Sequence, residues 1–136
     1  MSTFKHSKVG ATARYGDAGP GPKGEVMTAS FELDGREFVA LNGGPQFTFS
    51  PAISFVVNCD SQTDIDEYWA RLSDGGETQV CGWLKDRFGV SWQIVPRALR
   101  QMLDGADPER TNRVMQAIMT MTKLDLAALE RAWRQP

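Results

Sequence analysis

A pair of strands in the second half of the chain constrains the fold more than any other feature. The segment Cys81–Pro96 reads CGWLKDRFGVSWQIVP, in which β-branched and aromatic residues fill two arms around residues 85–89. Asp86 and Gly89 are typical of a position where the chain reverses. The pattern predicts a β-hairpin with strands over residues 80–84 and 90–95.

The second arm of this hairpin has two unlike faces. Because side chains alternate along a strand, Ser91, Gln93 and Val95 share one face, and Trp92 and Ile94 share the other. We expect one face to pack under a helix. We expect the face with the small hydroxyl and the amide to line a cavity with a few placed polar groups.

Composition predicts one ordinary globular domain over residues 1–136, since 41% of the residues are hydrophobic. A net charge of -2 provides no basic surface for nucleic acid. No apolar run is long enough to span a bilayer, and the first residues lack the apolar core of a signal peptide. We therefore expect a cytoplasmic protein whose partners include neither nucleic acid nor membrane.

Cys59 and Cys81 have no zinc spacing, so reduced thiols are expected, with a disulfide between them as the alternative.

The first third of the chain indicates strands without helices. Residues 4–15 alternate weakly, and the run Gly16–Gly24 accumulates glycine and proline, which predicts a loop. Residues 25–42 alternate around the pair Asp34-Gly35, which is a strong signal for a second hairpin.

A buried strand and an amphipathic helix are expected next. Residues 52–59 are almost entirely apolar, as in a fully buried strand. Apolar residues then recur at helical spacing between Ile65 and Leu72, Thr63 with Asp66 resembles a capping box, and Gly75 follows as a stop signal.

Helices replace strands after Pro96. We expect one helix over residues 97–103, a second capped at Asp107 and a third capped at Asp125. Strands followed by helices make an α+β fold class. Three methionines near the second helix, Met115, Met119 and Met121, are interpreted as core filler or dimer packing rather than a ligand surface.

Several stretches resemble a known family. RYGDAGPGP, LNGGPQFTFSPAISFVVNC, CGWLKDRFGVSWQIVP and RVMQAIMTM together resemble the PhnB-like branch of the vicinal oxygen chelate superfamily, which also contains glyoxalase and bleomycin resistance proteins. Members of the branch often carry the label demethylubiquinone methyltransferase-like. The resemblance implies paired βαβββ modules whose curved sheets wrap a cavity, usually in a homodimer.

On this resemblance, residues 1–50 form an incomplete first module, residues 51–96 the second module and residues 97–136 C-terminal helices. The opening strand and most of the first helix of the first module are missing. Either the sequence starts late or a partner chain supplies the missing edge. We expect a homodimer whose interface includes the exposed sheet edge and apolar residues of the C-terminal helices: Val114, Met115, Ile118, Met121, Leu129 and Trp133.

The resemblance also places the superfamily's usual metal ligands in the second module. The usual histidine falls at Ala52 and the usual glutamate at Gln93. Alanine cannot bind a metal and glutamine is a weak neutral ligand, so neither a metal nor another cofactor is expected at this site. His6 is interpreted as a solvated linker residue. No strand leads through a glycine-rich turn into a helix that could hold S-adenosylmethionine, so a methyltransferase is not expected.

Two hypotheses for the function remain open, and no catalytic residue is assigned under either. Carboxylates such as Asp86 are expected to cap turns, and Cys81 is expected to be a buried structural residue, because the sequence supplies no base for it. The first hypothesis is a metal-free protein that binds a small molecule. The second is a metal-dependent dioxygenase, isomerase or lyase whose remaining ligands lie in the missing part of the first module. The ligand-binding residues expected under the first hypothesis are Gln93, Ser91, Ser54, Asn58, Asn42, Trp83, Trp92 and Phe49.

Overall fold

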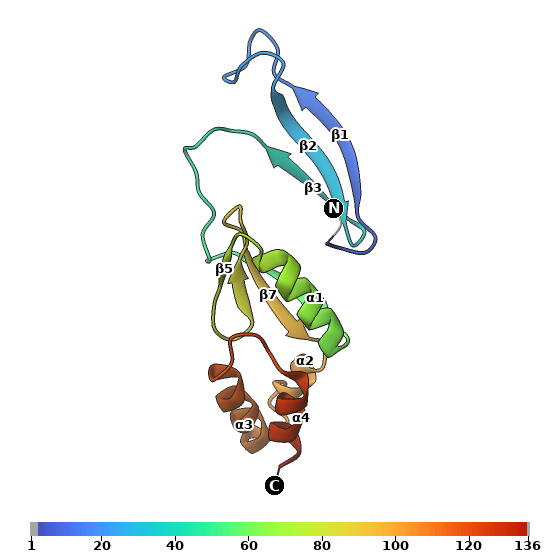
Figure 1. Ribbon diagram of the computed structural model, residues 1–136, viewed down its shortest axis with the longest axis vertical. Coiled ribbons are helices and arrows are strands. Elements are labelled where there is room, and N and C mark those ends of the chain that lie inside the picture. The colour runs from blue at the N-terminus through green and yellow to red at the C-terminus, as the bar shows by residue number, and fades with distance from the viewer. Residues whose placement is uncertain (1–2, 136) are drawn as a thin grey trace. The chain divides into compact units, whose positions relative to one another are not determined.

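The computed structural model describes residues 3–135, and it confirms the mixed α+β class with two β-sheets and four helices (Figure 1). The chain divides into two compact units, the first ending at Thr48 and the second beginning at Phe49.

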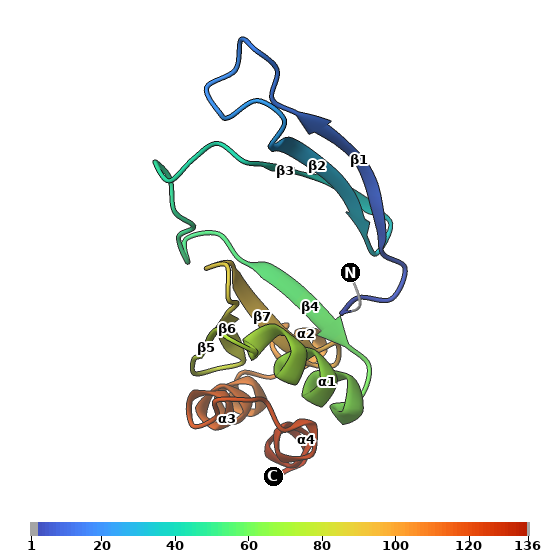
Figure 2. The same cartoon turned by 45° about the horizontal axis from the view of Figure 1, so that its top comes forward.

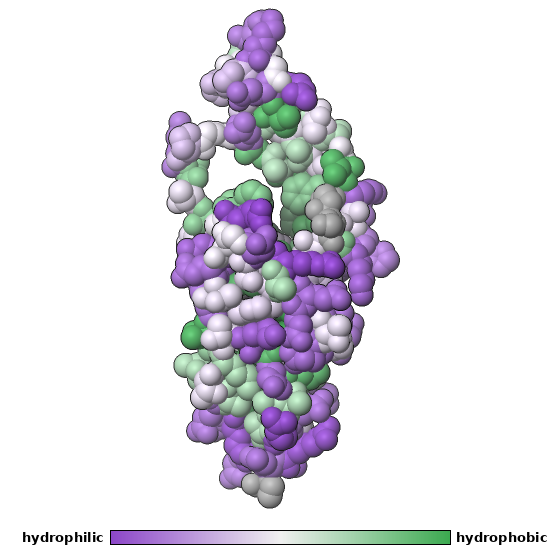
Figure 3. Space-filling model, viewed as in Figure 1, coloured by the Kyte–Doolittle hydropathy of each residue, from purple (hydrophilic) through white to green (hydrophobic). Residues whose placement is uncertain are grey.

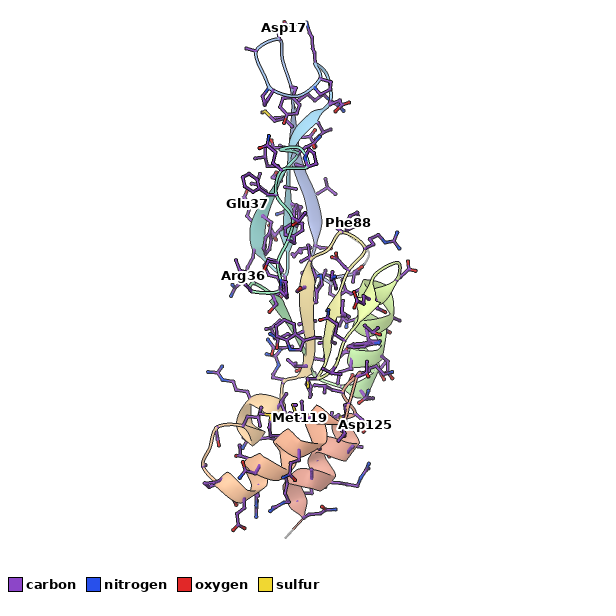
Figure 4. The ribbon with its side chains drawn as sticks, turned by 90° about the vertical axis from the view of Figure 1, so that its left-hand side faces the viewer. Asp17, Arg36, Glu37, Phe88, Met119 and Asp125 are labelled. Atoms are coloured by element: carbon purple, nitrogen blue, oxygen red, sulfur yellow. The ribbon has the colours of Figure 1, made fainter. Side chains whose placement is uncertain are left out.

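The first unit is a three-stranded antiparallel sheet in the order β1-β2-β3. Its strands are β1 (Lys8–Arg14), β2 (Val26–Leu33) and β3 (Arg36–Leu41). Asp34 and Gly35 join β2 to β3 with φ angles of 49° and 77°, both in the left-handed region that a tight two-residue hairpin turn requires. The predicted hairpin over residues 25–42 is therefore confirmed. Figure 4 shows Arg36 and Glu37 beside this turn.

Cross-strand pairs stabilise this sheet. Phe31 and Phe38 lie opposite each other and stack with ring centroids 5.5 Å apart. Glu32 faces Glu37 across the same strands, which places like charges opposite each other. Lys8 offsets this repulsion with an ion pair of 2.8 Å to Glu32.

Tyr15 anchors the Gly/Pro-rich loop of the first unit. It is the only buried residue among residues 3–48. Its hydroxyl donates a hydrogen bond to the carbonyl of Asn42. A Cβ atom at Gly21 would lie 2.4 Å from the Tyr15 ring, so the loop can pass this close only without a side chain at that position.

The second unit has a four-stranded mixed sheet in the order β4-β7-β6-β5. Strand β6 pairs antiparallel with both β5 and β7, whereas β4 runs parallel to β7 (Figure 2). The bounds are β4 (Phe55–Cys59), β5 (Glu77–Thr78), β6 (Trp83–Lys85) and β7 (Ser91–Pro96).

The predicted hairpin exists, but its first arm is shorter than expected. Cys81 and Gly82 have φ angles of 61° and 80°, so residues 80–82 form a turn and not a strand. Strand β5 has only two residues and was not predicted from the sequence. With β5 included, the elements from β4 to β7 follow the order β, α, β, β, β.

Helix α1 (Gln62–Ser73) packs on one face of this sheet through Ile65 and Leu72, both buried. The N-cap is Ser61, two residues before the predicted cap at Thr63. Ser61 accepts a hydrogen bond from the backbone N–H of Asp64 and donates one to its carboxylate. The expected cap of Thr63 with Asp66 was wrong, because the side chain of Ser61 already accepts the hydrogen bond from a free N–H group at the start of the helix.

Strand β4 lies at an edge of the sheet and is not fully buried as predicted. Val57 and Cys59 are buried, whereas Phe55 is 41% and Val56 is 51% exposed. Ile53, also expected in the strand, precedes it and is 76% exposed. Val56 lies on the face away from α1, whereas Phe55 shares the face of Val57 but lies at the exposed start of the strand.

Three helices close the second unit: α2 (Leu99–Met102), α3 (Pro108–Met119) and α4 (Leu126–Arg134). Asp107 caps α3 and Asp125 caps α4 through their carboxylates, as predicted. The helices share one core, in which Val114, Ile118 and Leu129 are buried. These three residues were expected in a dimer interface. The structure corrects this expectation, because the helices bury them against one another. No helix among the described residues is long and apolar enough to cross a membrane.

Candidate functional site

The second sheet has an open face on the side opposite α1. Alternation along paired strands places Val57, Ile94 and Leu84 on the face under α1, where all three are buried. The other face, called the open face below, carries the intervening residues of the same strands. They are Val56 and Asn58 of β4, Gln93 of β7, and Trp83 and Lys85 of β6.

A hydrogen bond between side chains defines the centre of the open face. The amide Nε2 of Gln93 donates to Oγ of Ser54 over 3.0 Å. In the register of the sheet, Gln93 lies between Val56 on one side and Trp83 on the other. An amide and a hydroxyl are therefore held in place between an aliphatic side chain and an indole. A ligand with polar groups on a flat apolar body would find both kinds of contact here.

The open face carries its charge at the β5–β6 edge. Lys85 and Glu77 face each other across these strands, with Nζ and Oε2 3.4 Å apart. The Lys85 side chain is 43% exposed and that of Glu77 is 64% exposed. The opposite charges of Lys85 and Glu77 neutralise each other, so the centre of the face is polar but uncharged.

The expected site residues divide into those that share the open face and those that do not. Gln93, Ser54, Asn58 and Trp83 come together from three neighbouring segments of the second unit. Ser91 lies on the same side of β7 but is only 3% exposed, so its hydroxyl is not accessible to a ligand on this face.

Trp92 lies on the opposite face of β7. Its indole N–H donates to the Asp86 carboxylate over 3.0 Å, and its ring lies 5.3 Å from that of Phe55. Asp86 also accepts from the backbone N–H groups of Phe88 and Val90, so it caps the hairpin turn as expected. Figure 4 shows Phe88 at the tip of this turn.

Two expected residues are separate from this group. Asn42 belongs to the first unit, where its side-chain amide donates to the carbonyl of Val26 over 3.2 Å. Phe49 precedes β4 and is 67% exposed. Neither is among the residues that the strands of the second sheet bring together.

A pocket of about 300 Å³ lies elsewhere, between α2, α3 and α4. Its lining includes Trp133, with the guanidinium of Arg110 5.5 Å from the ring centroid. The charged groups of this pocket already have partners: Arg110 pairs with Asp107, and Arg134 with Glu130. We favour the open face as the candidate site, because its amide and hydroxyl lie between an aliphatic side chain and an indole, whereas the charged groups that line the pocket are already paired. This pocket was not predicted from the sequence, since helical periodicity identifies the helices but not their packing.

The residues of the second unit do not fit the metal centre that the resemblance implies. Ala52 has no donor atom, and the amide nitrogen of Gln93 points its hydrogen toward Ser54. Within residues 3–135, no three His, Cys, Asp or Glu side chains gather where they could hold one ion. We therefore derive no step through a metal at this position. A site for S-adenosylmethionine does not fit either, because β4 leads into α1 through Asp60 and Ser61 without a glycine-rich turn.

The two cysteines are free thiols in different surroundings. Cys59 is 2% exposed, and burial raises the pKa of its thiol to about 11, which keeps it protonated and unreactive at neutral pH. Cys81 was expected to be buried, but it is only partly so. The turn before β6 holds it near the surface.

Comparisons with known proteins give a consistent family. The chain matches the profile of the 3-demethylubiquinone-9 3-methyltransferase family over residues 1–95. Among solved structures, it is similar to a PhnB protein from Bacillus cereus, described as a candidate 3-demethylubiquinone-9 3-methyltransferase. That match has 34% identity and a TM-score of 0.63, and it covers 70% of this chain and 83% of the other. Protein PA1353 from Pseudomonas aeruginosa shares the fold, with 24% identity, a TM-score of 0.53 and coverage of 65% and 77%. No curated protein sequence matches the chain.

Proposed function

Because the chain belongs to the PhnB-like 3-demethylubiquinone-9 3-methyltransferase family, we propose that it binds a small molecule on the open face of its second sheet, without a metal at the superfamily's usual position. The observation that carries this proposal is the hydrogen bond between Gln93 and Ser54, flanked by Trp83. It fixes an amide and a hydroxyl beside an aromatic surface, which suits a flat ligand with oxygen or nitrogen groups.

We propose that the second unit is one βαβββ module of the vicinal oxygen chelate fold and that the first unit contributes three strands of the other module. The element order β4, α1, β5, β6, β7 supports the first part of this statement. The methyltransferase name does not transfer to our proposal, since the residues around β4 lack the glycine-rich turn that S-adenosylmethionine binding would need.

A thermal-shift screen of the purified protein against aromatic and oxygen-rich metabolites tests ligand binding. A ligand present at 100 times its Kd stabilises the folded state by about 2.7 kcal/mol and raises the Tm. In Gln93→Leu, each true ligand should bind about 2- to 10-fold more weakly, the effect of one lost hydrogen bond. Gln116→Leu, on the exposed surface of α3, is the matched control and should change nothing. Unchanged stabilisation of every ligand in Gln93→Leu would remove the open face from consideration.

We also propose that the protein forms a homodimer through its first unit. Both β1 and β3 are edge strands, and apolar side chains such as Val9, Val39 and Leu41 are each more than 60% exposed. Unpaired edges and uncovered apolar side chains favour pairing with a second copy. Light scattering at micromolar concentration should give twice the chain mass of 15.1 kDa. A monomer of 15.1 kDa at this concentration would contradict the dimer but leave ligand binding untouched.

A further inference from the structure

The pocket between α2, α3 and α4 combines an indole wall with guanidinium groups. Its volume of about 300 Å³ is at the lower end of the range found for small-molecule sites. Trp133 and the buried Met102 supply its apolar surface. The other lining residues are small, polar or charged: Ala98, Gln101, Arg110, Glu130 and Arg134. Figure 3 shows hydrophilic residues around the lower ends of α3 and α4, as expected for a polar pocket in this place.

Contacts between the three helices hold the walls of the pocket in place. The hydroxyl of Thr111 on α3 donates to the carbonyl of Met102 on α2 over 3.3 Å. The guanidinium of Arg113 on α3 donates to the carbonyls of Ala132 and Gln135, over 3.2 Å and 2.6 Å, on either side of Trp133. These hydrogen bonds fix α2 and the end of α4 against α3. The pocket is therefore formed before a ligand arrives, which lowers the entropy lost on binding.

Arg110 and Trp133 make a flat surface in this pocket. Cζ of Arg110 lies 5.5 Å from the centroid of the Trp133 ring, a distance at which a guanidinium is attracted to the ring by a cation–π interaction. Stacking occupies the face of the guanidinium, whereas its N–H groups point outward along its edge. Arg110 can therefore contact the indole and bind an anion at the same time.

The ion pairs in the pocket leave N–H donors for a ligand. Nε of Arg110 lies 3.1 Å from Oδ2 of Asp107, and Nη2 of Arg134 lies 3.2 Å from Oε2 of Glu130. Each pair is one contact of a group that has five N–H donors. Both pairs join residues of one helix or its cap, and all four side chains are at least 40% exposed, so the pairs themselves contribute little to stability.

The charges that line the pocket favour an anion. Two guanidinium groups and one carboxylate, that of Glu130, leave a positive balance. A guanidinium matches the two oxygens of a carboxylate, and an indole matches a flat ring. We propose that this pocket binds an aromatic carboxylate, with the ring against Trp133 and the carboxylate accepting hydrogen bonds from Arg110 and Arg134. The pocket is separate from the open face, so this inference does not depend on the proposed function.

The experiment records the indole N–H signals of the ¹⁵N-labelled full-length chain during titration with benzoate, at constant ionic strength. The chain has four tryptophans, and Trp133→Phe assigns the signal of the pocket. Because a small ligand in an exposed pocket gains little affinity, the titration extends to about 20 mM. We expect the Trp133 signal to shift and saturate. The Trp83 signal reports separately on the open face.

The neutral analogue benzamide tests the role of the carboxylate, and it should bind the pocket at least about tenfold more weakly than benzoate. Arg110→Gln and Arg134→Gln should each weaken benzoate binding about 3- to 10-fold. Arg131→Gln is the matched control, because it removes a positive charge from the exposed surface of α4 outside the lining of the pocket. It should change the Kd of benzoate by less than about twofold.

Three outcomes would overturn the proposal. A Trp133 signal that does not move with benzoate would show that the pocket binds no aromatic carboxylate. Equal shifts with benzamide would show that the carboxylate is not recognised. If Arg131→Gln weakens binding as much as Arg110→Gln, the anion responds to the general charge of the helices and not to the pocket. The side chain of Arg134 is 75% exposed, so Arg134→Gln should fold normally, and its indole spectrum verifies this.

Discussion

The two units of the molecule are built from similar hairpins but differ in what they bury. Among residues 3–48, Tyr15 is the only buried residue. In the second unit, Ile65, Leu84 and Ile94 are completely inaccessible, and the helices add a second cluster with Val114 and Leu129. Turn chemistry and alternation are as clear in the first unit as in the second. Local sequence rules therefore fix strands and turns, whereas stability depends on a second layer that covers them.

Removal of a core side chain should give the largest difference in stability between a substitution in the second unit and one in the first. Leu84→Ala deletes a fully buried side chain between β6 and α1, so we expect a loss of about 2–5 kcal/mol in the free energy of unfolding. Val39→Ala, at a side chain that is 64% exposed in the single chain, should cost less than about 0.5 kcal/mol where the chain is monomeric, and more at concentrations where the proposed dimer covers it. Urea unfolding followed by far-UV circular dichroism measures both, because all four tryptophans lie in the second unit and would not report on the first. A loss for Val39→Ala as large as that for Leu84→Ala would show that the first unit is covered in solution, as the proposed dimer requires.

Glycine substitutions sharpen the same comparison. A Cβ atom at Gly76 would lie 2.1 Å from the carbonyl oxygen of Lys85, so Gly76→Ala must push the end of α1 away from β6. We expect a cost of about 1–3 kcal/mol. At Gly43 the nearest atom lies 3.7 Å away in the side chain of Leu41, and Gly43→Ala should be neutral or stabilise by up to about 1 kcal/mol. Thermal unfolding of the pair is the measurement, and equal Tm values would contradict the close packing at Gly76.

The anchor of the first unit should have a smaller but local effect. Tyr15→Phe removes the hydrogen bond to the carbonyl of Asn42 and should cost about 0.5–1.5 kcal/mol. Hydrogen exchange of the amides in residues 16–24 should rise in this variant, with the second unit unaffected. Gly21→Ala, whose Cβ would meet the Tyr15 ring, should raise exchange in the same loop. Unchanged exchange in both variants would show that Tyr15 does not hold the loop.

The smallest expected effects on stability are electrostatic. In the first unit the effect is lost at alkaline pH, and in the second unit it is lost at acid pH. In the first unit, a hydrogen bond and the charge of Glu32 raise the pKa of Lys8. A lysine whose pKa is raised by folding stabilises the folded state at pH values below 10.5. This stabilisation is lost as the pH rises through the pKa of the folded state. In the second unit, hydrogen bonds from Lys123 and Gln62 lower the pKa of Asp66, so its contribution is present above 3.8 and is lost as pH falls through the folded value.

Single substitutions can assign each limit to its unit. Lys8→Gln should reduce the fall of Tm at alkaline pH in a plot of Tm against pH. Asp66→Asn should reduce the fall of Tm at acid pH in the same plot. Both groups are solvent-exposed, so 1 M salt should reduce each effect. An acid limit that is unchanged in Asp66→Asn would show that the pair with Lys123 does not contribute in solution.

Sequence reasoning succeeded where a local rule acts alone. The pair Asp34-Gly35 requires left-handed backbone, and Asp107 and Asp125 each precede a helix that needs an N-cap, so the hairpin and both helix starts were predicted. It failed where a contact distant in sequence decides the outcome. Residues 80–82 have the composition of a strand but are held as a turn by the segment after α3.

The candidate site shows the same limit. Gln93, Ser54, Asn58 and Trp83 were all named from the sequence, and the strands of the second sheet bring them to one face. Trp92 was also named, although alternation alone places it opposite Gln93, and its bond to Asp86 settles its direction. The contact of Cys81 with Met119 was not foreseen, because α3 and the turn are separated by a long stretch of chain.

The parallel pairing of β4 with β7 has a consequence for the order in which the second unit folds. These two strands can meet only after all residues from Asp60 to Val90 have been placed between them. Closing such a long loop costs more chain entropy than closing the hairpin of β6 and β7, which are neighbours in sequence. The hairpin and α1 should therefore form early, and β4 should join last, as a rate-limiting step. Since Ser54 precedes β4 directly, the hydrogen bond to Gln93 would appear only at the end of folding, and a chain stalled before that step would expose β7 as an unpaired edge.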